Sequence, residues 1–308
     1  MRLLLALMWL LHWLPLPLLG RIGEAIGAVL YRVMGPRRRI TLVNLKLCLP
    51  ELSDTERETL ARQHFGAYAR SILERGILWW ASEARLRRLI KVEPGVPLAD
   101  FQAGPLILLC PHFVCLDVAG VAVALEASAC SVYSQQQNPV FDTALRRGRE
   151  RFHPVRIFTR EAGIKPVIRA MREKLPFFML PDMDFGIRDA AFVPFFGVPA
   201  ATLTAPARIA AATAAGVIPI IATYLPHYRG WTVRFHPRWS DFPGDDIIAA
   251  TRRVNAFIEE AVRQAPAQYL WTHKRFKTRP PGSKGFYGHD RHDGDDENAA
   301  PEVIAARR

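Results

Sequence analysis

A histidine and an aspartate lie five residues apart in the stretch PLILLCPHFVCLDVAG, residues 105–120. The apolar run Leu106–Cys110 is typical of a buried strand, and Pro111 suits the end of that strand because it needs no ladder partner. Residues five apart are about 140° apart around a helix, so His112 and Asp117 would not share a helical face. We therefore expect His112 in the loop after the strand and Asp117 in the first turn of the next helix, where the two side chains can meet.

A carboxylate bonded to one imidazole nitrogen fixes the tautomer and leaves the other nitrogen free to take a proton. Such a pair can activate a hydroxyl or an amine for acyl transfer. Ligands of α/β sheets bind outside the carboxyl ends of the strands, which is where His112 is expected. A loop histidine followed by a helix-capping aspartate is the simpler interpretation of the pair taken alone.

Two further charged stretches offer binding groups. The run RRGRERF, residues 146–152, places four arginines within six positions and includes Arg149; its alternative interpretation is a solvated helix face. The segment LPDMDFGIRD begins at residue 180, the last residue of a predicted strand, and carries Asp182 and Arg188. Guanidinium groups bind phosphate bidentately, so these arginines are candidates for anion binding.

The segments that must position these groups alternate between strand and helix from Pro105 onward. The expected strands are nearly all apolar, which is typical of a sheet buried on both faces, so we predict an α/β sandwich. The expected strands are Leu106–Cys110, Cys130–Ser134, Phe177–Leu180, Val217–Leu225 and Trp231–His236. The expected helices are Val118–Leu125, Pro139–Phe152, Ile164–Glu173, Thr202–Ala212 and Asp246–Gln264.

The N-terminal segment predicts a membrane anchor. Residues 3–20 are 18 residues without a formal charge, about the lower limit for a membrane span. Apolar residues then continue at helical spacing to Val33, and no small-x-small site follows, which favours an anchor over a signal peptide. Residues 1–49 hold seven Lys or Arg against one acid, so this flank is expected on the cytoplasmic side. A spanning segment and a helix lying in the interface both remain open.

Composition limits the partners. The chain of 308 residues is half hydrophobic and carries a net charge of +12, so anionic partners are expected: nucleic acid, membrane headgroups, or an acidic protein or substrate. None of the four cysteines forms a C-x-x-C pair, which favours buried reduced thiols over a disulfide framework. We predict no metal and no cofactor, because no residues have the spacing of a ligand cluster.

The C-terminal region divides into an aromatic basic block and a polar tail. The block APAQYLWTHKRFKTRP, residues 265–280, suits either nucleic acid or a lipid headgroup at the membrane interface. The polar tail after it, including the HDRHDGDDE tract, is expected to be disordered. We therefore divide the chain into an anchor with an amphipathic helix (1–40), a catalytic domain (41–281) and a tail (282–308).

Four blocks in this order, HFVCLD, PDMDFG, FVPFFG and PAQYLWTHKRFKTRP, resemble the lipid A biosynthesis acyltransferases. This lauroyl/myristoyl acyltransferase family lies within the lysophospholipid acyltransferase superfamily, and the resemblance covers about residues 1–281. It implies a glycerol-phosphate-acyltransferase-like fold around a mixed sheet. It also implies an enzyme of the bacterial inner membrane, with its catalytic domain on the cytoplasmic face, that moves a fatty acyl chain from acyl carrier protein to a hydroxyl of a lipid A precursor. Nucleic acid is not an expected partner of such an enzyme.

The resemblance also implies roles for individual residues. By position, His112 would be the general base and Asp117 its partner, although many family members carry Glu at the position of Asp117. Arg149 matches the family's active-site arginine and Asp182 the acidic residue of its third block. Arg188 and Arg149 are expected to bind phosphate on either substrate. No covalent intermediate is expected, because a base that activates the acceptor hydroxyl makes a serine or cysteine nucleophile unnecessary.

Two alternatives remain open on the sequence. One is an acyltransferase of the same superfamily that acts on another lipid acceptor, a lysophospholipid or an aminolipid. The other is a basic, membrane-tethered binding protein without catalytic activity.

Overall fold

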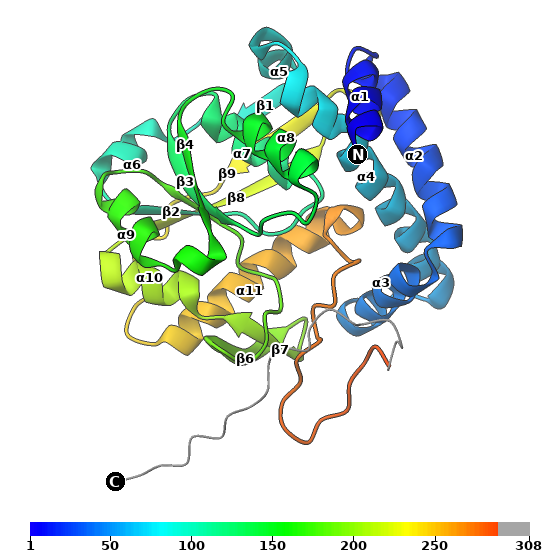
Figure 1. The fold of residues 1–308 in the computed structure, drawn as a ribbon. Helices are drawn as coiled ribbons and strands as arrows, with labels where there is room; N and C mark the ends of the chain where they lie inside the picture. The colour runs from blue at the N-terminus through cyan, green and yellow to red at the C-terminus, as the bar shows by residue number, and fades with distance from the viewer. Residues whose placement is uncertain (289–308) are drawn as a thin grey trace.

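A seven-stranded sheet forms the centre of the computed structural model, which describes residues 1–288 (Figure 1). The strand order is β1-β9-β8-β2-β5-β3-β4, and every neighbouring pair is parallel except β8 with β9. These strands are β1 (Ile90–Glu93), β2 (Leu106–Leu109), β3 (Ala129–Tyr133), β4 (Val155–Thr159), β5 (Phe177–Met179), β8 (Gly216–Tyr224) and β9 (Trp231–Phe235). The predicted α/β class with a mixed sheet is confirmed.

Two cores lie on opposite faces of the sheet. Side chains of a strand alternate between faces, and in β2 Leu106 and Leu108 enter one core while Ile107 and Leu109 enter the other. The first core contains α7 and the second contains α9, α10 and α11; Figure 1 shows α7 and α11 on opposite sides of the sheet. The helices among and after the strands are α6 (Leu98–Ala103), α7 (Leu116–Ala124), α8 (Pro139–Arg149), α9 (Lys165–Arg172), α10 (Ala205–Thr213) and α11 (Ile247–Gln264).

All five expected strands and all five expected helices are present, with no end shifted by more than three residues. The sequence did not reveal β1 and β4, which form the two edges of the sheet and are half exposed, so they lack an apolar run. It also missed the hairpin of β6 (Ala190–Phe195) and β7 (Val198–Leu203), whose Val193 and Phe195 are fully buried.

The N-terminal apolar segment folds as parts of two helices, α1 (Arg2–Leu11) and α2 (Leu16–Val33), with Pro15 between them. Ten residues of α1 extend about 15 Å, half the thickness of a bilayer core. Within residues 1–288, no helix combines the length and the apolar composition that crossing a membrane requires. The predicted anchor, for which a spanning and an interfacial form were both open, stays a prediction.

Helix α2 packs closely along α4 (Asp54–Trp80), and small residues allow this approach. A Cβ on Gly27 would lie 2.5 Å from the Cα of Gly66, so no larger residue fits there without moving a helix. A helix, α3 (Gly35–Cys48), spans the predicted boundary between residues 40 and 41. The last helix before the sheet is α5 (Glu83–Leu89).

Two residues of the predicted tail, Phe286 and Tyr287, are packed against the body. Tyr287 is 7% exposed and donates a hydrogen bond of 2.5 Å to Oδ1 of Asn44 in α3. Its hydroxyl also accepts a hydrogen bond of 3.1 Å from the backbone N–H of Phe276. The prediction of disorder is therefore wrong for Phe286 and Tyr287, and the HDRHDGDDE tract lies outside the described residues.

Candidate active site

His112 lies directly after β2, as predicted, but its carboxylate partner is Asp182. Nδ1 of His112 lies 2.7 Å from Oδ1 of Asp182, and the backbone N–H of His112 donates to the same carboxylate at 3.0 and 3.2 Å. Asp182 follows β5, which is a parallel neighbour of β2, so the two strands deliver both residues to one edge of the sheet. The predicted direct pair of His112 with Asp117 is therefore wrong.

Asp182 is ionised and fixes the tautomer of His112. Burial raises the pKa of this carboxyl, which is 1% exposed, but the positive charge and hydrogen bonds of His112 outweigh burial and hold the pKa below its usual range. An ionised carboxylate can only accept, so Nδ1 carries the proton. In the neutral form of the ring, Nε2 then has its lone pair free to take a proton.

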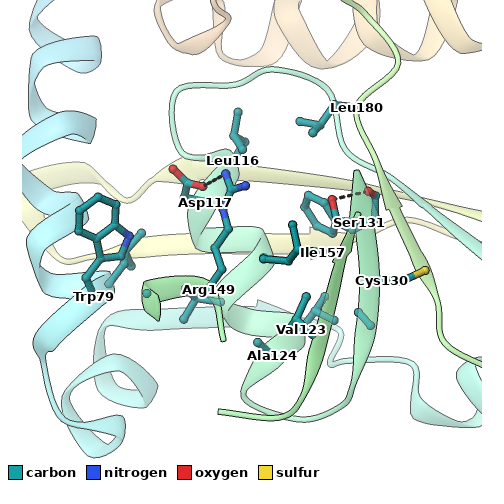
Figure 2. Close-up of a pocket in the computed structure, with 17 residues that line it drawn as sticks. Trp79, Leu116, Asp117, Val123, Ala124, Cys130, Ser131, Arg149, Ile157 and Leu180 are labelled. Carbon is teal, nitrogen blue, oxygen red and sulfur yellow. Dashed lines mark hydrogen bonds and ion pairs between the residues drawn. The ribbon is translucent and has the colours of Figure 1, made fainter. Parts of the chain in front are cut away.

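Asp117 occupies the first turn of α7, as predicted, and it is bound by two arginines. Oδ1 accepts a hydrogen bond of 2.9 Å from Arg149 of α8, and Oδ2 forms an ion pair of 2.9 Å with Nε of Arg75 in α4. Burial raises the pKa of Asp117, but the charges of Arg75 and Arg149 together lower it to about 2. This cluster keeps a net charge of +1, because two guanidinium groups share one carboxylate. Figure 2 shows Arg149 extended toward Asp117.

Arg188 is not brought to this cluster. Its side chain is 95% exposed, and its ion-pair partner is the neighbouring Asp189 at 4.0 Å. The sequence missed Arg75, because a single arginine in a long amphipathic helix has the same pattern as a solvated one. Only the three-dimensional packing of α4 against α7 shows that Arg75 faces a carboxylate.

The C-terminal aromatic block holds the loop of His112. The backbone N–H of Leu270 donates to the carbonyl of His112 at 2.9 Å, and that of Val114 donates to Gln268 at 2.8 Å. Tyr269 and Trp271 of this block are 3% and 1% exposed, so the expectation that they grip a ligand at a surface is wrong. The block instead fixes the position of the candidate base.

Two charged residues of this region have structural partners. Asp184, two residues after Asp182, accepts hydrogen bonds of 2.7 Å from both the N–H and the hydroxyl of Thr278. Arg275 is 2% exposed and donates to Ala201 and Thr202 of β7. The spacing of Asp182 and Asp184 does not reveal which carboxylate meets the histidine.

An apolar cavity lies beside the Asp117 cluster (Figure 2). Asp117 and Arg149 line it together with side chains of α7, β3, β4 and the end of β5. Its apolar walls include Leu78, Trp79, Leu116, Val121, Val123, Ala124, Val155, Ile157, Phe178 and Leu180. Its volume is about 70 Å³, little more than two liquid waters occupy at ~30 Å³ each, so it accommodates only a few methylene groups as it stands.

The two cysteines that flank His112 are not nucleophiles. All four cysteines of the chain are buried and unpaired, as predicted. Burial raises the pKa of Cys110 and of Cys115 well above the usual range, so both remain protonated thiols. His112 is therefore the group near the end of β2 that is able to accept a proton.

Residues 1–278 match the family described as bacterial lipid A biosynthesis acyltransferase. The lipid A biosynthesis lauroyltransferase of Escherichia coli (strain K12) is 30% identical over 286 residues, 92% of this chain and 93% of that protein. The lipid A biosynthesis myristoyltransferase of the same organism is 31% identical over 275 residues, 86% of this chain and 82% of that protein. These similarities define the protein as an acyltransferase. More narrowly, the chain belongs to the bacterial lipid A biosynthesis acyltransferases, as its motifs predicted.

Among solved structures, a 1-acyl-sn-glycerophosphate acyltransferase from Thermotoga maritima matches with a TM-score of 0.39 and 12% identity, covering 82% of this chain and 98% of that one. A likeness of this size does not establish a shared site.

Proposed function

We propose that this acyltransferase moves a fatty acyl chain from acyl carrier protein to a hydroxyl of a lipid A precursor, with His112 as the general base. The observation that carries the proposal is the hydrogen bond of 2.7 Å between Nδ1 of His112 and Asp182. It leaves Nε2 as a free acceptor at the carboxyl end of the central strand, where substrates of α/β sheets bind.

The transfer is direct. Nε2 of His112 takes the proton of the acceptor hydroxyl as its oxygen attacks the thioester carbonyl, and a tetrahedral oxyanion forms. Asp182 stabilises the resulting imidazolium. When the oxyanion collapses, the C–S bond breaks, and the proton on Nε2 passes to the departing thiolate. The products are an ester and the free thiol of the carrier, and no acyl-enzyme is needed.

The Asp117 cluster binds anionic parts of the substrates. Arg149 uses one donor on Asp117, and its side chain is still 33% exposed, so its other N–H groups can reach a phosphate. Asp117 holds this guanidinium in place, and its negative charge offsets the repulsion between Arg75 and Arg149. The acyl chain enters the apolar cavity that Asp117 and Arg149 line. The walls of this cavity move apart to accommodate a full acyl chain.

The exposed apolar side chains of residues 3–13 support a position on the surface of the inner membrane. Leu3, Leu10 and Trp13 are 85%, 59% and 67% exposed. Large apolar side chains gathered on an exposed surface are typical of a membrane-binding face. Changing Leu3, Leu7 and Leu10 together to Ser should reduce co-flotation with anionic vesicles. A matched control changes Leu98 and Ile248, exposed apolar residues of α6 and α11, to Ser and should leave flotation unchanged.

The activity test uses purified protein in detergent, radiolabelled acyl carrier protein thioester and a purified lipid A precursor. Wild type should form an acylated precursor and His112→Ala should not. A different result is that the folded wild type leaves the lipid A precursor unchanged and transfers the acyl chain to a lysophospholipid or an aminolipid. That result would favour the alternative acceptor. Family membership removes the non-catalytic alternative.

A further inference from the structure

Two histidines are bound to the same short segment, residues 182–184, through opposite ring nitrogens. His112 meets the carboxylate of Asp182 through Nδ1 at 2.7 Å. His273 meets the backbone N–H of Asp184 through Nε2 at 3.1 Å. The proposed mechanism uses the first imidazole and assigns nothing to the second.

The hydrogen bond from Asp184 determines the tautomer of His273. A backbone N–H can only donate, so Nε2 of His273 is the acceptor and carries no proton. Burial, followed by the charge of nearby His112, lowers the pKa of His273 to about 4. The ring is therefore neutral at neutral pH, and its proton lies on Nδ1. The hydrogen bond from Asp184 engages Nε2 alone and does not involve the Nδ1–H.

The position of His273 is rigidly fixed relative to His112. Leu270, three residues before His273, donates its backbone N–H to the carbonyl of His112. The side chain of Asn44 donates to the carbonyl of His273 at 2.7 Å. Thr278 binds the carboxylate of Asp184 at 2.7 Å, so both sides of the contact are held. These hydrogen bonds thus tie the segment that carries this neutral N–H donor to the loop of the candidate base.

We propose that His273 is a second catalytic residue, a neutral donor whose Nδ1–H binds the oxyanion formed when the acceptor hydroxyl attacks the thioester. This inference rests on the proposed function above. The proton stays on His273 throughout; the hydrogen bond strengthens as the carbonyl oxygen becomes negative and weakens when the C–S bond breaks. His112 moves the proton, and His273 stabilises the charge.

Two substitutions separate this role from a structural one. The side-chain amide of a glutamine reaches the place of Nε2, so His273→Gln keeps an acceptor for Asp184 and loses the donor at Nδ1. The shorter amide of an asparagine lies near the place of Nδ1, so His273→Asn keeps the donor and loses the acceptor. We expect His273→Gln to lose about 10²–10³-fold in kcat with little change in KM, as for removal of one oxyanion donor, and His273→Asn to retain more activity.

The readouts are kcat and KM for transfer from acyl carrier protein thioester, with thermal unfolding to verify folding. A His273→Gln enzyme within threefold of wild type, or one impaired no more than His273→Asn, would overturn the role of His273. If His273→Gln is normal while His112→Ala is inactive, the proposed function stands and this inference alone fails. Equal activity of His112→Ala and wild type would instead remove the proposed function.

Discussion

Two carboxylates near the end of β2 have opposite kinds of partners. Asp182 meets one imidazole and one backbone N–H, so the pair gains or loses charge with a single proton. Asp117 lies between two guanidinium groups that stay protonated at any ordinary pH, so its charge and theirs are constant. The first arrangement can move a proton and the second can only bind an anion.

The comparison reverses an assignment made from spacing. His112 and Asp117 belong to one local motif, yet the acid that orients the histidine comes from a segment 70 residues later. Asp117 nevertheless belongs to the same region, since it binds Arg149 and both residues line the cavity. Proximity in sequence therefore paired His112 with Asp117, whereas the fold pairs His112 with Asp182.

The largest expected effect comes from Asp182. Asp182→Asn removes the charge that fixes the tautomer of His112, and we expect it to reduce kcat by about 10²–10⁴-fold, the same loss that we expect for His112→Ala. Because the two residues act as one unit, the double variant should be little worse than either single variant. Initial rates of acyl transfer for the four enzymes measure this coupling.

The same double-variant measurement, made with Asp117 in place of Asp182, tests whether the two carboxylates have different roles. His112→Ala combined with Asp117→Asn should be closer to additive, because Asp117 acts on the arginines. The pairing of His112 with Asp117 would be restored by two results together. The rate effects of His112→Ala and Asp117→Asn would be strongly non-additive, and Asp182→Asn would lower the rate only slightly.

A smaller effect is expected for Asp117 itself. Asp117→Asn leaves Arg75 and Arg149 without their anion, and we expect a loss of about 10²-fold in kcat/KM from the displaced guanidinium groups. Asp117→Glu should retain more, because it keeps the charge. Arg149→Lys should recover only part of what Arg149→Ala loses, since a point charge replaces a planar fork. Equal kinetics for the three forms of residue 149 would refute its role in substrate binding.

The pKa of Asp117 also predicts a pH dependence of stability. The folded-state pKa, about 2, lies below the unfolded value near 3.9, so the carboxylate stabilises the fold above about pH 4 and this stability is lost as the pH falls toward 2. Its size is about 2 kcal/mol at neutral pH. Urea unfolding of wild type and Asp117→Asn should show a difference in free energy at pH 7 that narrows as the pH falls below 4. A difference independent of pH would mean that Asp117 is not held ionised by the arginines.

The sequence predicted the fold better than the connections within the site. Central strands such as β2 and β8 are continuous apolar runs, so they could be identified, whereas the half-exposed edge strands β1 and β4 lack such a pattern. The candidate site residues His112, Asp117, Arg149 and Asp182 were proposed from residue type and from the resemblance of their motifs. Their pairing depends on the strand order, which places β5 beside β2, and no local pattern contains that order.

The last prediction concerns a substitution in the wall of the cavity beside Asp117. This substitution should leave the pair of His112 and Asp182 unchanged. Gly120 and Gly148 both line this cavity, but a Cβ on Gly120 would meet nothing within 4 Å, whereas one on Gly148 would overlap the ring of Trp79. Gly120→Leu should therefore fold normally and fill space that an acyl chain needs. We expect it to favour shorter acyl donors over longer ones by about tenfold in kcat/KM, the worth of one or two methylene groups in an apolar pocket.

The control is Gly148→Ala, which should lower the melting temperature because α8 can no longer approach Trp79. The measurement compares kcat/KM for a series of carrier-bound donors of increasing chain length, since each buried methylene contributes about 0.8 kcal/mol. The pH dependence of kcat for Gly120→Leu should match that of wild type, because His112 and Asp182 are untouched. If chain preference is unchanged in a folded Gly120→Leu enzyme, the acyl chain does not enter this cavity, and the Asp117 cluster binds only the polar parts of the substrates.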